Sequence, residues 1–514
     1  MQIIGRYMDD AMLNFENKPF LIEGHKQLTF KQLDIISEKV AKNFIKIGLQ
    51  RGDKIGILAN NQTEWLISFF AATKIGIAVV ALSPRYRENE LLYMINHAEV
   101  KCIISLNQSE EFNFIHFFES YQEKLSTVTS YIYINGVSAK GISFEQMLQD
   151  DESIKLDSYK NQVSEDDVAI MIYTSGTTGQ PKGVMITHKS ILAAAIAEVE
   201  HLSIKEEDVF IQNLPLNHVG GITCQIISAL VAKASAVLIP EFKPSAILAS
   251  IEQYGVTVFA GVPTMYLMIF NQPDLSNYNL SSIRVSVVGG SNIEPALVEK
   301  VKAVLPKVHI VNLYGLSESS GACILTKIGD SIKKIKSTIG AAIGDFELQV
   351  VDQQRNPVPN GELGELAIKG ECVAKGYYQD KQNTKETFSE EGWLYTGDMV
   401  IKDDEGYISF KGRKKEIYIQ AGFNVFPAEI ENLLTKHPAV QLVAGIGVPD
   451  PFYGEVGHYF IVKRPGQEVS AEELMAYCQE RLANYKIPKK FIFVDNVPMT
   501  PAGKIQKSKL KEMV

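Results

Sequence analysis

A chain of 514 residues is longer than one hydrophobic core usually organises, so we expect at least two domains. Its 46% hydrophobic and 22% charged residues are typical of a soluble globular protein. With 51 Lys and Arg residues against 60 Asp and Glu residues, the net charge of -9 excludes a bulk attraction to nucleic acid or anionic lipid. A site for an anion must therefore be local.

The five cysteines are scattered along the chain, and no pair has the CxxC or CxH spacing of a zinc site. A disulfide framework is not indicated either, so a reducing cytoplasm is the compartment we expect. The segment MQIIGRYMDDAML carries charges where a signal peptide needs its apolar core. The most apolar stretches, 69–82 and 222–240, contain Lys74 and Lys233 and fall short of about 18 uninterrupted apolar residues. We therefore expect no transmembrane segment.

The first part of the chain alternates between helix and strand patterns. Thr29 and Gln32 form a capping box, apolar residues recur at three- and four-residue steps from Leu33 to Ile47, and Gly48 ends the predicted helix. This alternation indicates an α/β fold with a mostly parallel sheet. Residues 108–165 are polar and poorly periodic, and we interpret them as irregular connection. The other predicted elements here are strands over 54–58, 77–82 and 101–105 and helices over 64–74 and 88–97.

The alternation resumes with a buried strand over 168–173. From Gly340 onward, alternating strands between Pro/Gly turns predict a small β-rich subdomain. Past Gly412, strands near Leu442 and Phe460 and helices near 427–436 and 471–482 predict a small α+β domain. Before these regions, strands are predicted over 209–213, 236–239, 256–260, 283–288 and 308–313, and helices are predicted to begin at 190, 222, 245 and 294.

A loop rich in glycine and hydroxyl residues, Thr174 to Gly183, follows the strand over 168–173. Glycine lets backbone N–H groups approach an anion, the hydroxyls add donors, and Lys182 adds a positive charge. An ordinary surface turn is the alternative, but a phosphate-binding loop explains the composition better. It is not a Walker A loop, since Lys182 is followed by Gly183 and not by Ser or Thr. The residues expected to bind phosphate are Thr174, Ser175, Gly176, Thr177, Thr178, Gly179 and Lys182.

The sequence YTSGTTGQPKGV (173–184) resembles the phosphate loop of the adenylate-forming superfamily: acyl- and aryl-CoA synthetases, adenylation domains of nonribosomal peptide synthetases, and firefly-type luciferases. The resemblance implies an enzyme in which a carboxylate attacks the α-phosphate of ATP, pyrophosphate leaves, and a thiol then attacks the acyl-adenylate. Such an enzyme must supply cations and N–H donors to the phosphate oxygens. Further segments resemble other motifs of the family in the same order, so that nearly the whole chain is covered: 312–318, 393–398, 411–416, 420–431 and 500–507.

The resemblance places adenine and the metal ion on the segment 312–318. Tyr314 would stack on adenine beside Asn312, and Glu318, otherwise a solvated surface carboxylate, would bind Mg²⁺. Ser317 replaces the usual threonine and keeps the hydroxyl that contacts the α-phosphate. A second segment, VVGGSNIEP (287–295), resembles the glycine pair of the family that flanks the adenine and acyl pocket. A plain turn between strand and helix is the alternative. The remaining nucleotide-binding residues expected in these two segments are Gly289, Gly290, Ser291 and Gly315.

Ribose contacts and a hinge are implied nearer the C-terminus. Asp398 in WLYTGD would accept hydrogen bonds from both ribose hydroxyls, and Arg413 would also contact the ribose. Lys415 would be the pivot of a mobile domain, and Gly422 would let the backbone pack beside a pantetheine arm. A turn cap at Asp398 and a solvated charge run over 411–416 are the alternatives.

Catalytic roles are implied for four residues. Lys504 in TPAGKIQK would offset the charge that develops on the carboxylate and α-phosphate, although a lone lysine near a chain end is usually inert. His218 in LPLNHVGG would lie near the substrate carboxylate, with a structural core histidine as the alternative. Thr174 and Glu318 complete the predicted catalytic set.

The predicted acyl pocket is apolar or small and has no Asp, Lys or Arg to hold a second charge. This indicates a monocarboxylic acid with an apolar tail, preferably a medium- or long-chain fatty acid, for which the glycines at 220 and 221 leave room. A coumarate-like aromatic acid stays open, and so do CoA and a carrier-protein pantetheine as the thiol. An amino acid is disfavoured as the substrate, because its ammonium group would need an acidic partner and the predicted pocket has none. The residues expected to line the pocket are Val219, Gly220, Gly221, Ile222, Cys224, Phe259, Val262, Pro263, Thr264 and Met265.

The sequence thus predicts a large N-terminal adenylation domain over 1–412, with α/β subdomains, parallel sheets and a small β-rich subdomain, followed by a small mobile α+β domain over 413–514. ATP, Mg²⁺ and coenzyme A are the implied cofactors. No nucleic acid partner is expected, and a homodimer is left open. Two other functions compete: a non-catalytic nucleotide-binding scaffold, which intact Lys182 and Asp398 argue against, and a P-loop kinase or NTPase, which would release phosphate instead of pyrophosphate.

Overall fold

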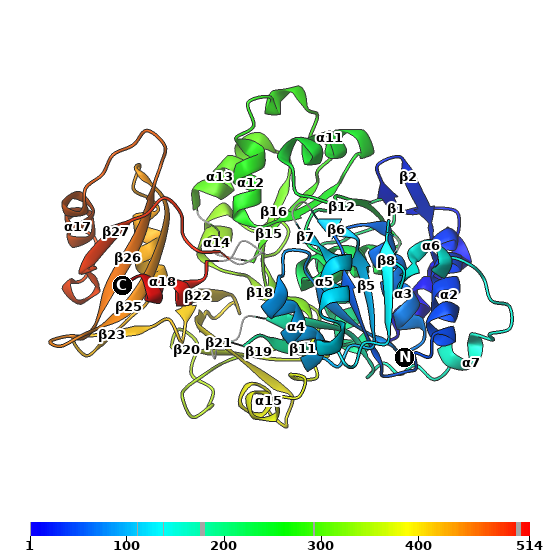
Figure 1. Ribbon diagram of the computed structural model, residues 1–514. Helices are drawn as coiled ribbons and strands as arrows, with labels where there is room; N and C mark the ends of the chain where they lie inside the picture. Colours follow the sequence, from blue (N-terminus) through cyan, green and yellow to red (C-terminus); the bar gives the residue numbers. More distant parts are fainter. Residues whose placement is uncertain are drawn as a thin grey trace. The chain divides into compact units, whose positions relative to one another are not determined.

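The structure is a computed structural model that describes residues 2–109, 112–136, 138–174, 180–290, 293, 295–499 and 505–514 (Figure 1). It divides into two compact units, and the chain passes between them more than once. We call them the large unit and the small unit. The large unit comprises Met1–Lys336, Gly340–Glu347 and Ile368–Leu394, and the small unit comprises Ser337–Ile339, Leu348–Ala367 and Tyr395–Val514.

A nine-stranded sheet in the large unit has the order β18-β17-β16-β15-β14-β12-β13-β1-β2 (Figure 1). All pairs from β16 to β1 are parallel, while β2, β17 and β18 pair antiparallel at the two margins. The strands are β1 Pro19–Glu23, β2 Lys26–Thr29, β12 Val209–Gln212, β13 Ser235–Leu238, β14 Val258–Gly261, β15 Val285–Gly289, β16 His309–Leu316, β17 Gly321–Leu325 and β18 Ala341–Ala342.

A second sheet of the large unit has seven strands in the order β11-β10-β4-β3-β5-β8-β9. Only β10 and β11 pair antiparallel within it, so the predicted α/β fold with mostly parallel sheets is confirmed. The strands are β3 Lys54–Leu58, β4 Ala78–Leu82, β5 Cys102–Leu106, β8 Ser130–Ile134, β9 Ile142–Ser143, β10 Val168–Thr174 and β11 Lys182–Thr187.

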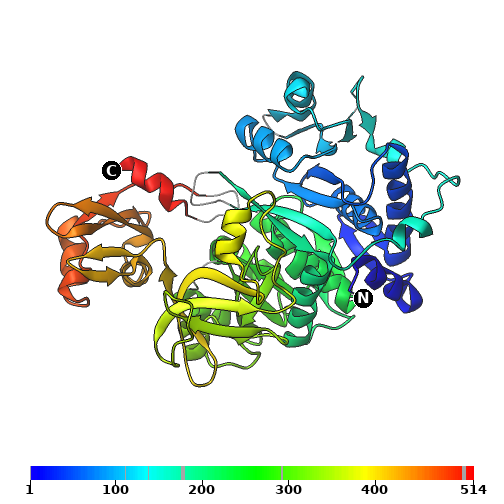
Figure 2. The same ribbon diagram turned by 90° about the horizontal axis from the view of Figure 1, so that it is seen from below.

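Helices connect these strands and cover the sheets. At the start of α2, Thr29 accepts a hydrogen bond from the N–H of Gln32 and the Gln32 side chain accepts one from Thr29, so the predicted capping box is confirmed. Helices α1, α2 and α3 pack together, as the blue ribbons of Figure 2 show. Among the described residues, no helix is long and apolar enough to cross a membrane. The main helices of this unit are α1 Ile4–Phe15, α2 Phe30–Lys46, α3 Thr63–Lys74, α4 Glu88–His97, α8 His188–His201, α11 Pro244–Tyr254, α12 Pro263–Phe270, α13 Pro295–Val304 and α15 Lys381–Thr387.

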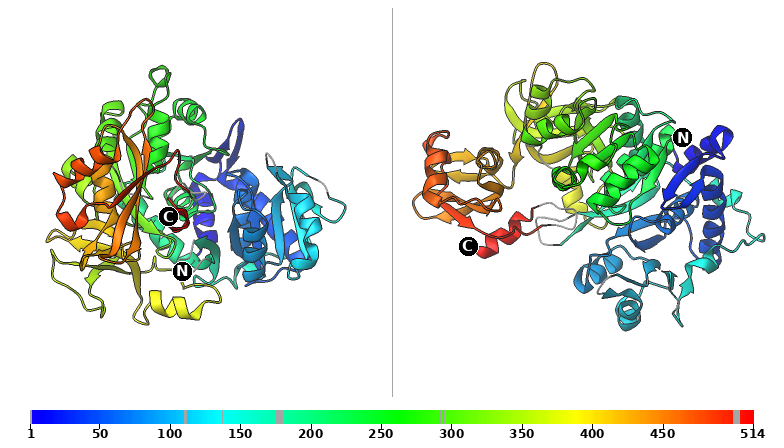
Figure 3. Two further views of the ribbon diagram at one scale, coloured as in Figure 1. Left: turned by 60° about the vertical axis from the view of Figure 1, so that its left-hand side comes forward. Right: turned by 90° about the horizontal axis from the view of Figure 1, so that it is seen from above.

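The nine-stranded sheet is buried on both faces. On one face α11, α12 and α13 form a core with inward residues of the strands such as Ile211, Phe259 and Val288 (Figure 3). On the other face alternate residues such as Val258 and Val287 join a larger core that also includes the seven-stranded sheet. Parallel strands covered on both sides read as continuous apolar runs, which is why the sequence identifies them so readily.

Two parts of the sequence prediction are wrong. Residues 108–165 are not merely irregular, because β8 lies in the seven-stranded sheet between β5 and β9 and pairs parallel with both, and the helix α5 (Phe114–Ser120) precedes it. The N-terminal α1 and the hairpin of β1 and β2 were not expected at all. The strands β8 and β2 have five and four residues and so carry no long local period, whereas α1 has 12 residues and was missed.

The small unit holds the predicted β-rich and α+β parts. Most residues of a four-stranded sheet, β19-β20-β21-β22, belong to it, and a five-stranded sheet follows with the order β24-β23-β26-β25 and β27 beside β26. Its elements are β19 Glu347–Val351, β20 Leu363–Lys369, β21 Trp393–Lys402, β22 Ile408–Arg413, β23 Tyr418–Gln420, β24 Phe423–Val425, α16 Pro427–Leu434, β25 Val440–Asp450, β26 Gly454–Lys463, α17 Ala471–Gln479, β27 Lys490–Phe493 and α18 Lys507–Leu510.

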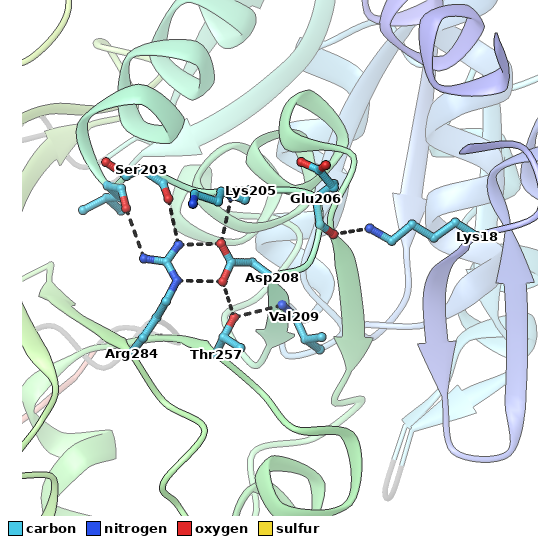
Figure 4. Close-up of polar contacts among 9 residues, drawn as sticks. Lys18, Ser203, Lys205, Glu206, Asp208, Val209, Thr257 and Arg284 are labelled. Carbon is cyan, nitrogen blue, oxygen red and sulfur yellow. Dashed lines mark hydrogen bonds and ion pairs between the residues drawn. The ribbon is translucent and has the colours of Figure 1, made fainter. Parts of the chain in front are cut away.

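A buried carboxylate ties together the amino ends of three neighbouring strands of the nine-stranded sheet (Figure 4). Asp208, 5% exposed, accepts hydrogen bonds from Arg284 Nε at 2.7 Å and Thr257 Oγ1 at 2.7 Å. Thr257 Oγ1 in turn accepts the N–H of Val209 at 3.0 Å. Burial alone would raise the pKa of Asp208, but the hydrogen bonds from Arg284 and Thr257 outweigh it and lower the pKa.

We predict that Asp208→Asn lowers the free energy of unfolding by about 2 kcal/mol at pH 7, since it leaves the Arg284 guanidinium without its carboxylate. Urea unfolding followed by the fluorescence of Trp65, buried in the same unit, measures this change. Because the folded pKa is lowered, the wild type loses this stabilisation as the pH falls below the ordinary value of 3.8. Asp345→Asn, at an exposed position, is the control, and equal stability of the two variants would contradict the assignment.

Candidate active site

Three segments singled out in the sequence meet at one edge of the nine-stranded sheet. Strands β12, β14, β15 and β16 are consecutive neighbours and run parallel, so their carboxyl ends share an edge. His218 follows β12. Gly289 is the last residue of β15, and Gly290 follows it. The segment 312–318 comprises the end of β16 and the two residues after it. The structure therefore brings these predicted site residues to one edge, whereas Ser291 lies outside the described residues.

The segment 312–318 is held by tight hairpin packing between β16 and β17. The N–H of Asn312 donates to Thr326 Oγ1 at 2.8 Å, and the N–H of Thr326 donates to the Asn312 carbonyl at 3.0 Å. A Cβ atom on Gly315 would lie 2.1 Å from the Gly321 carbonyl oxygen, so this close approach requires glycine. The register shifts between Tyr314 and Gly315, which marks a bulge at the residue predicted to meet adenine.

The ring of Tyr377 lies between a cation and a carboxylate: its face contacts Lys182 and its hydroxyl contacts Glu318. The Tyr377 hydroxyl donates to Glu318 Oε1 at 2.7 Å, and Lys182 Nζ lies 5.0 Å from the centre of the Tyr377 ring. Lys182 Nζ also donates to Asn383 Oδ1. Burial and the charge of Glu318 raise the pKa of Tyr377, so its hydroxyl stays a donor at neutral pH. Sequence reasoning missed Tyr377 and Asn383, which lie 59 and 201 residues from their partners.

The phosphate loop joins two antiparallel strands. Thr174, the last residue of β10, faces Lys182, the first residue of β11, so the strand begins one residue before the predicted end of the loop. The Tyr93 hydroxyl donates to the carbonyl of Pro181 at 3.1 Å and fixes the entry to β11. The predicted phosphate ligands between these strands, Ser175, Gly176, Thr177, Thr178 and Gly179, lie outside the described residues.

The predicted ribose residues meet in the small unit. Asp398 on β21 is 1% exposed and pairs across the strands with Arg413 on β22, whose Nε lies 3.1 Å from Asp398 Oδ1. The N–H of Asp398 donates to Thr396 Oγ1 at 3.1 Å, and that hydroxyl donates to the Leu366 carbonyl at 2.9 Å. These bonds fix the backbone at Asp398, and its carboxylate lies beside the exposed guanidinium of Arg413.

Lys415 and Gly422 lie on turns of the small unit. Lys415 is exposed in the turn that follows β22. Ala421 and Gly422 both have positive φ, +54° and +82°, and form the two-residue turn of the hairpin between β23 and β24. A Cβ atom on Gly422 would meet nothing within 4 Å, so the turn conformation accounts for this glycine without a ligand. Lys504 lies outside the described residues.

The segment after β12 has a defined local structure around His218. The Nδ1 atom of His218 accepts the N–H of Gly220 at 3.0 Å, so the neutral ring carries its proton on Nε2. A Cβ atom on Gly221 would lie 2.1 Å from the Pro215 carbonyl oxygen. The absence of a side chain at Gly221 is therefore explained by backbone packing, and the expectation that it leaves room for a long chain has no support in the fold.

A buried carboxyl group behind this segment was not found from the sequence. Glu198 on α8 is 3% exposed and accepts a hydrogen bond from Ser228 Oγ at 2.9 Å. Burial raises its pKa to about 8, although hydrogen bonds from Ser228 and Cys224 oppose the shift. Cys224 belongs to a π-helical turn, Ile222–Ile227, that packs against α8. The carboxyl group is therefore neutral at pH 7 and adds no charge beside the predicted acyl pocket.

Comparisons with known proteins agree with this arrangement. The profile of the AMP-binding enzyme family matches residues 8–378, and that of the AMP-binding enzyme C-terminal domain matches residues 429–504. YngI of Bacillus subtilis (strain 168), named as an acyl-CoA synthetase, is 32% identical over 99% of this chain and 96% of that protein. The mitochondrial medium-chain acyl-CoA ligase ACSF2 of Mus musculus is 28% identical over 99% and 87%. The anthranilate CoA ligase AuaEII in complex with anthranoyl-AMP has a TM-score of 0.89 at 28% identity, over 99% of this chain and 97% of that one.

The fold and the clustered site thus define an enzyme that activates a carboxylate as its adenylate. The chain belongs to the adenylate-forming superfamily of AMP-binding enzymes, so the resemblance noted in the sequence is confirmed. Within it, the chain is an AMP-forming acyl-CoA synthetase, an acid–thiol ligase that uses ATP and CoA as substrates.

We predict that Glu198→Gln makes the free energy of unfolding less dependent on pH. The folded pKa of Glu198 is raised above its ordinary value of 4.5 to about 8, so stability is highest below 4.5 and falls as the pH rises to 8. Removing the ionisable group should leave stability near pH 5 almost unchanged and raise it by about 4 kcal/mol at pH 9. Urea unfolding at both pH values tests this, with the exposed Glu200→Gln on the same helix as control. Parallel pH profiles of the wild type and Glu198→Gln would refute it.

Proposed function

We propose that the enzyme converts a monocarboxylic acid with an apolar tail, preferably a medium- or long-chain fatty acid, into its CoA thioester through an acyl-adenylate. The observation that carries this proposal is the common edge of β12, β14, β15 and β16. The apolar residue Val219 follows β12, the predicted pocket residues Val262 and Pro263 follow β14, and the nucleotide segment 312–318 ends and follows β16. A tail and an adenylate can then be bound side by side.

In the first step a carboxylate oxygen attacks the α-phosphorus of ATP, and the bond between the α- and β-phosphates breaks to release pyrophosphate. Lys182 and Thr174 flank the phosphate loop and supply a cation and a hydroxyl to the phosphate oxygens. Lys504 offsets the charge between carboxylate and α-phosphate, while Tyr314 and Asn312 bind adenine. Ser317, 7% exposed, directs its hydroxyl to the α-phosphate.

Glu318 is the residue we assign to Mg²⁺. Mg²⁺ is usually held by one or two carboxylates together with substrate phosphates and water, so a single protein carboxylate beside bound ATP fits the ion. When bound, the ion would be held by Glu318 and would supply positive charge that offsets the charge of the leaving pyrophosphate. The hydroxyl of Tyr377 holds one oxygen of Glu318 at 2.7 Å and so orients the carboxylate toward the phosphates.

The second step is assigned to a rotation of the C-terminal domain, 413–514, about Lys415. The thiol of CoA attacks the acyl carbonyl and forms the C–S bond, its proton is released to water, and AMP departs as the bond between the acyl carbon and the phosphate oxygen breaks. Asp398 and Arg413 bind the ribose hydroxyls in both steps. Gly422 belongs to the turn that approaches the pantetheine. A cytoplasmic location is part of the proposal, and five cysteines without disulfide bonds support it.

An aryl-CoA ligase is the second candidate. The similarity to an anthranilate CoA ligase supports it, because that enzyme, 28% identical to this chain, was solved with an aromatic adenylate, anthranoyl-AMP. Close packing at Gly221 also removes one argument for a long, narrow pocket. The two candidates share every step of the chemistry and differ only in the acid.

The first experiment is pyrophosphate release from Mg²⁺-ATP with a panel of fatty and aromatic acids, with and without CoA. We expect release to depend on a fatty acid, an acyl-CoA to form only with CoA, and Lys504→Ala to reduce the rate about 100- to 1000-fold. The exposed Lys511→Ala is the matched control. Preference for an aromatic acid would support the second candidate, adenylate that ignores CoA would indicate a carrier protein, and no pyrophosphate with any acid would sink the proposal.

We further predict that Tyr377→Phe raises the Mg²⁺ concentration needed for half-maximal adenylation about tenfold or more, since the partner that orients a metal-bound carboxylate is lost. Titration of Mg²⁺ at fixed ATP measures the change. The neighbouring Tyr378→Phe removes a hydroxyl that contacts Glu99 instead, and should leave the Mg²⁺ requirement as in the wild type. A rate loss in Tyr377→Phe that Mg²⁺ does not relieve would contradict the assigned role.

A further inference from the structure

The two ends of the segment 500–504, which contains Lys504, are joined within the small unit. Met499 and Ile505 form an antiparallel bridge, and the N–H of Gln506 donates to the Pro498 carbonyl at 2.8 Å. The described residues on either side of the segment are therefore paired with each other like the base of a hairpin.

Lys507 fixes this base to the rest of the unit. Its Nζ lies 2.6 Å from Glu416 Oε2 and 2.7 Å from Glu431 Oε1, and its side chain is 17% exposed. Burial alone would lower the pKa of Lys507, but the charges of Glu431 and Glu416 outweigh it and raise the pKa. Glu431 also accepts the N–H of Gly445 at 2.7 Å. Two charge-assisted hydrogen bonds to carboxylates, in a largely buried position, restrict the Lys507 side chain to one conformation.

The two carboxylates come from segments with separate roles. Glu416 directly follows Lys415, the proposed pivot, and its N–H donates to the Arg413 carbonyl at 2.9 Å. Glu431 lies on α16, which packs against β25 and β22. The ammonium group of Lys507 thus joins the hinge segment, a core helix and the base of the Lys504 segment at one point.

We infer that Lys507 is a positioning residue for adenylation, because its ion pairs with Glu416 and Glu431 hold the described residues that follow Lys504 in the chain against the hinge segment. The inference rests on the proposed function, because it assigns Lys504 to the first step only. A purely structural role would act alike on both steps. A positioning role acts on the step that uses Lys504 and spares the thiol step.

The test compares the two half-reactions in Lys507→Met, Lys507→Arg and Glu416→Gln. We expect Lys507→Met to slow pyrophosphate release from saturating ATP and acid about 10- to 100-fold in kcat, with KM for ATP nearly unchanged. Thioester formation from supplied acyl-adenylate and CoA should stay within about twofold of the wild type, because that step does not use Lys504. Lys507→Arg keeps the charge and should restore most of the first rate, and Lys509→Met, exposed on the same helix, is the matched control.

Equal losses in both half-reactions, or none in either, would overturn the inference. If Lys507→Met does not fold, Glu416→Gln carries the test, since it removes one of two partners and leaves Glu431 in place. Pyrophosphate release by the wild type and its loss in Lys504→Ala are measured in the same assay. A wild type that releases none refutes the proposed function itself, whereas an active wild type with an unaffected Lys507→Met refutes only the positioning role.

Discussion

The parallel pairing of β12, β14, β15 and β16 is the constraint on which the site depends. Parallel register sends all four carboxyl ends to one edge, so segments that are far apart in the sequence become neighbours there. At the opposite edge, hydrogen bonds from Thr257 and Arg284 to Asp208 join the amino ends of three of these strands. Polar groups thus hold one edge rigidly, while the other edge is left to loops that bind ligand.

Charged groups of the site are held by partners that also restrict their direction. Lys182 faces the Tyr377 ring and Asn383, and Tyr377 donates to Glu318. A lysine on its flexible stem costs side-chain entropy to order, and a ring beneath it reduces that cost before a phosphate arrives. The Tyr377 hydroxyl donates a hydrogen bond to one carboxylate oxygen of Glu318. The remaining lone pairs of the carboxylate are then available to the proposed Mg²⁺ ion. Preorganisation of this kind is what electrostatic catalysis requires.

Most of the regular fold could be predicted from the sequence, because its evidence is local. The capping box at Thr29 and the apolar runs of the parallel strands need no knowledge of distant residues. The motifs assigned Asp398 and Arg413 to the same ribose, and the structure pairs the two residues across β21 and β22, while their binding of ribose stays a prediction. What the sequence could not predict depends on long-range contact: Tyr377 beside Glu318, the neutral Glu198 against Ser228, and Lys507 between two carboxylates. Single residues of these types are common everywhere, and only the fold makes them partners.

The glycines illustrate how geometry changes the functional argument. In the sequence, Gly221 suggested space for a substrate, yet a side chain there would strike the Pro215 carbonyl oxygen at 2.1 Å. Gly315 is explained in the same way by the Gly321 carbonyl oxygen, also at 2.1 Å. Both glycines are required by backbone approach at the ligand edge, so neither reports the size of the acid. Selection among acids must then be made by side chains and not by these two glycines.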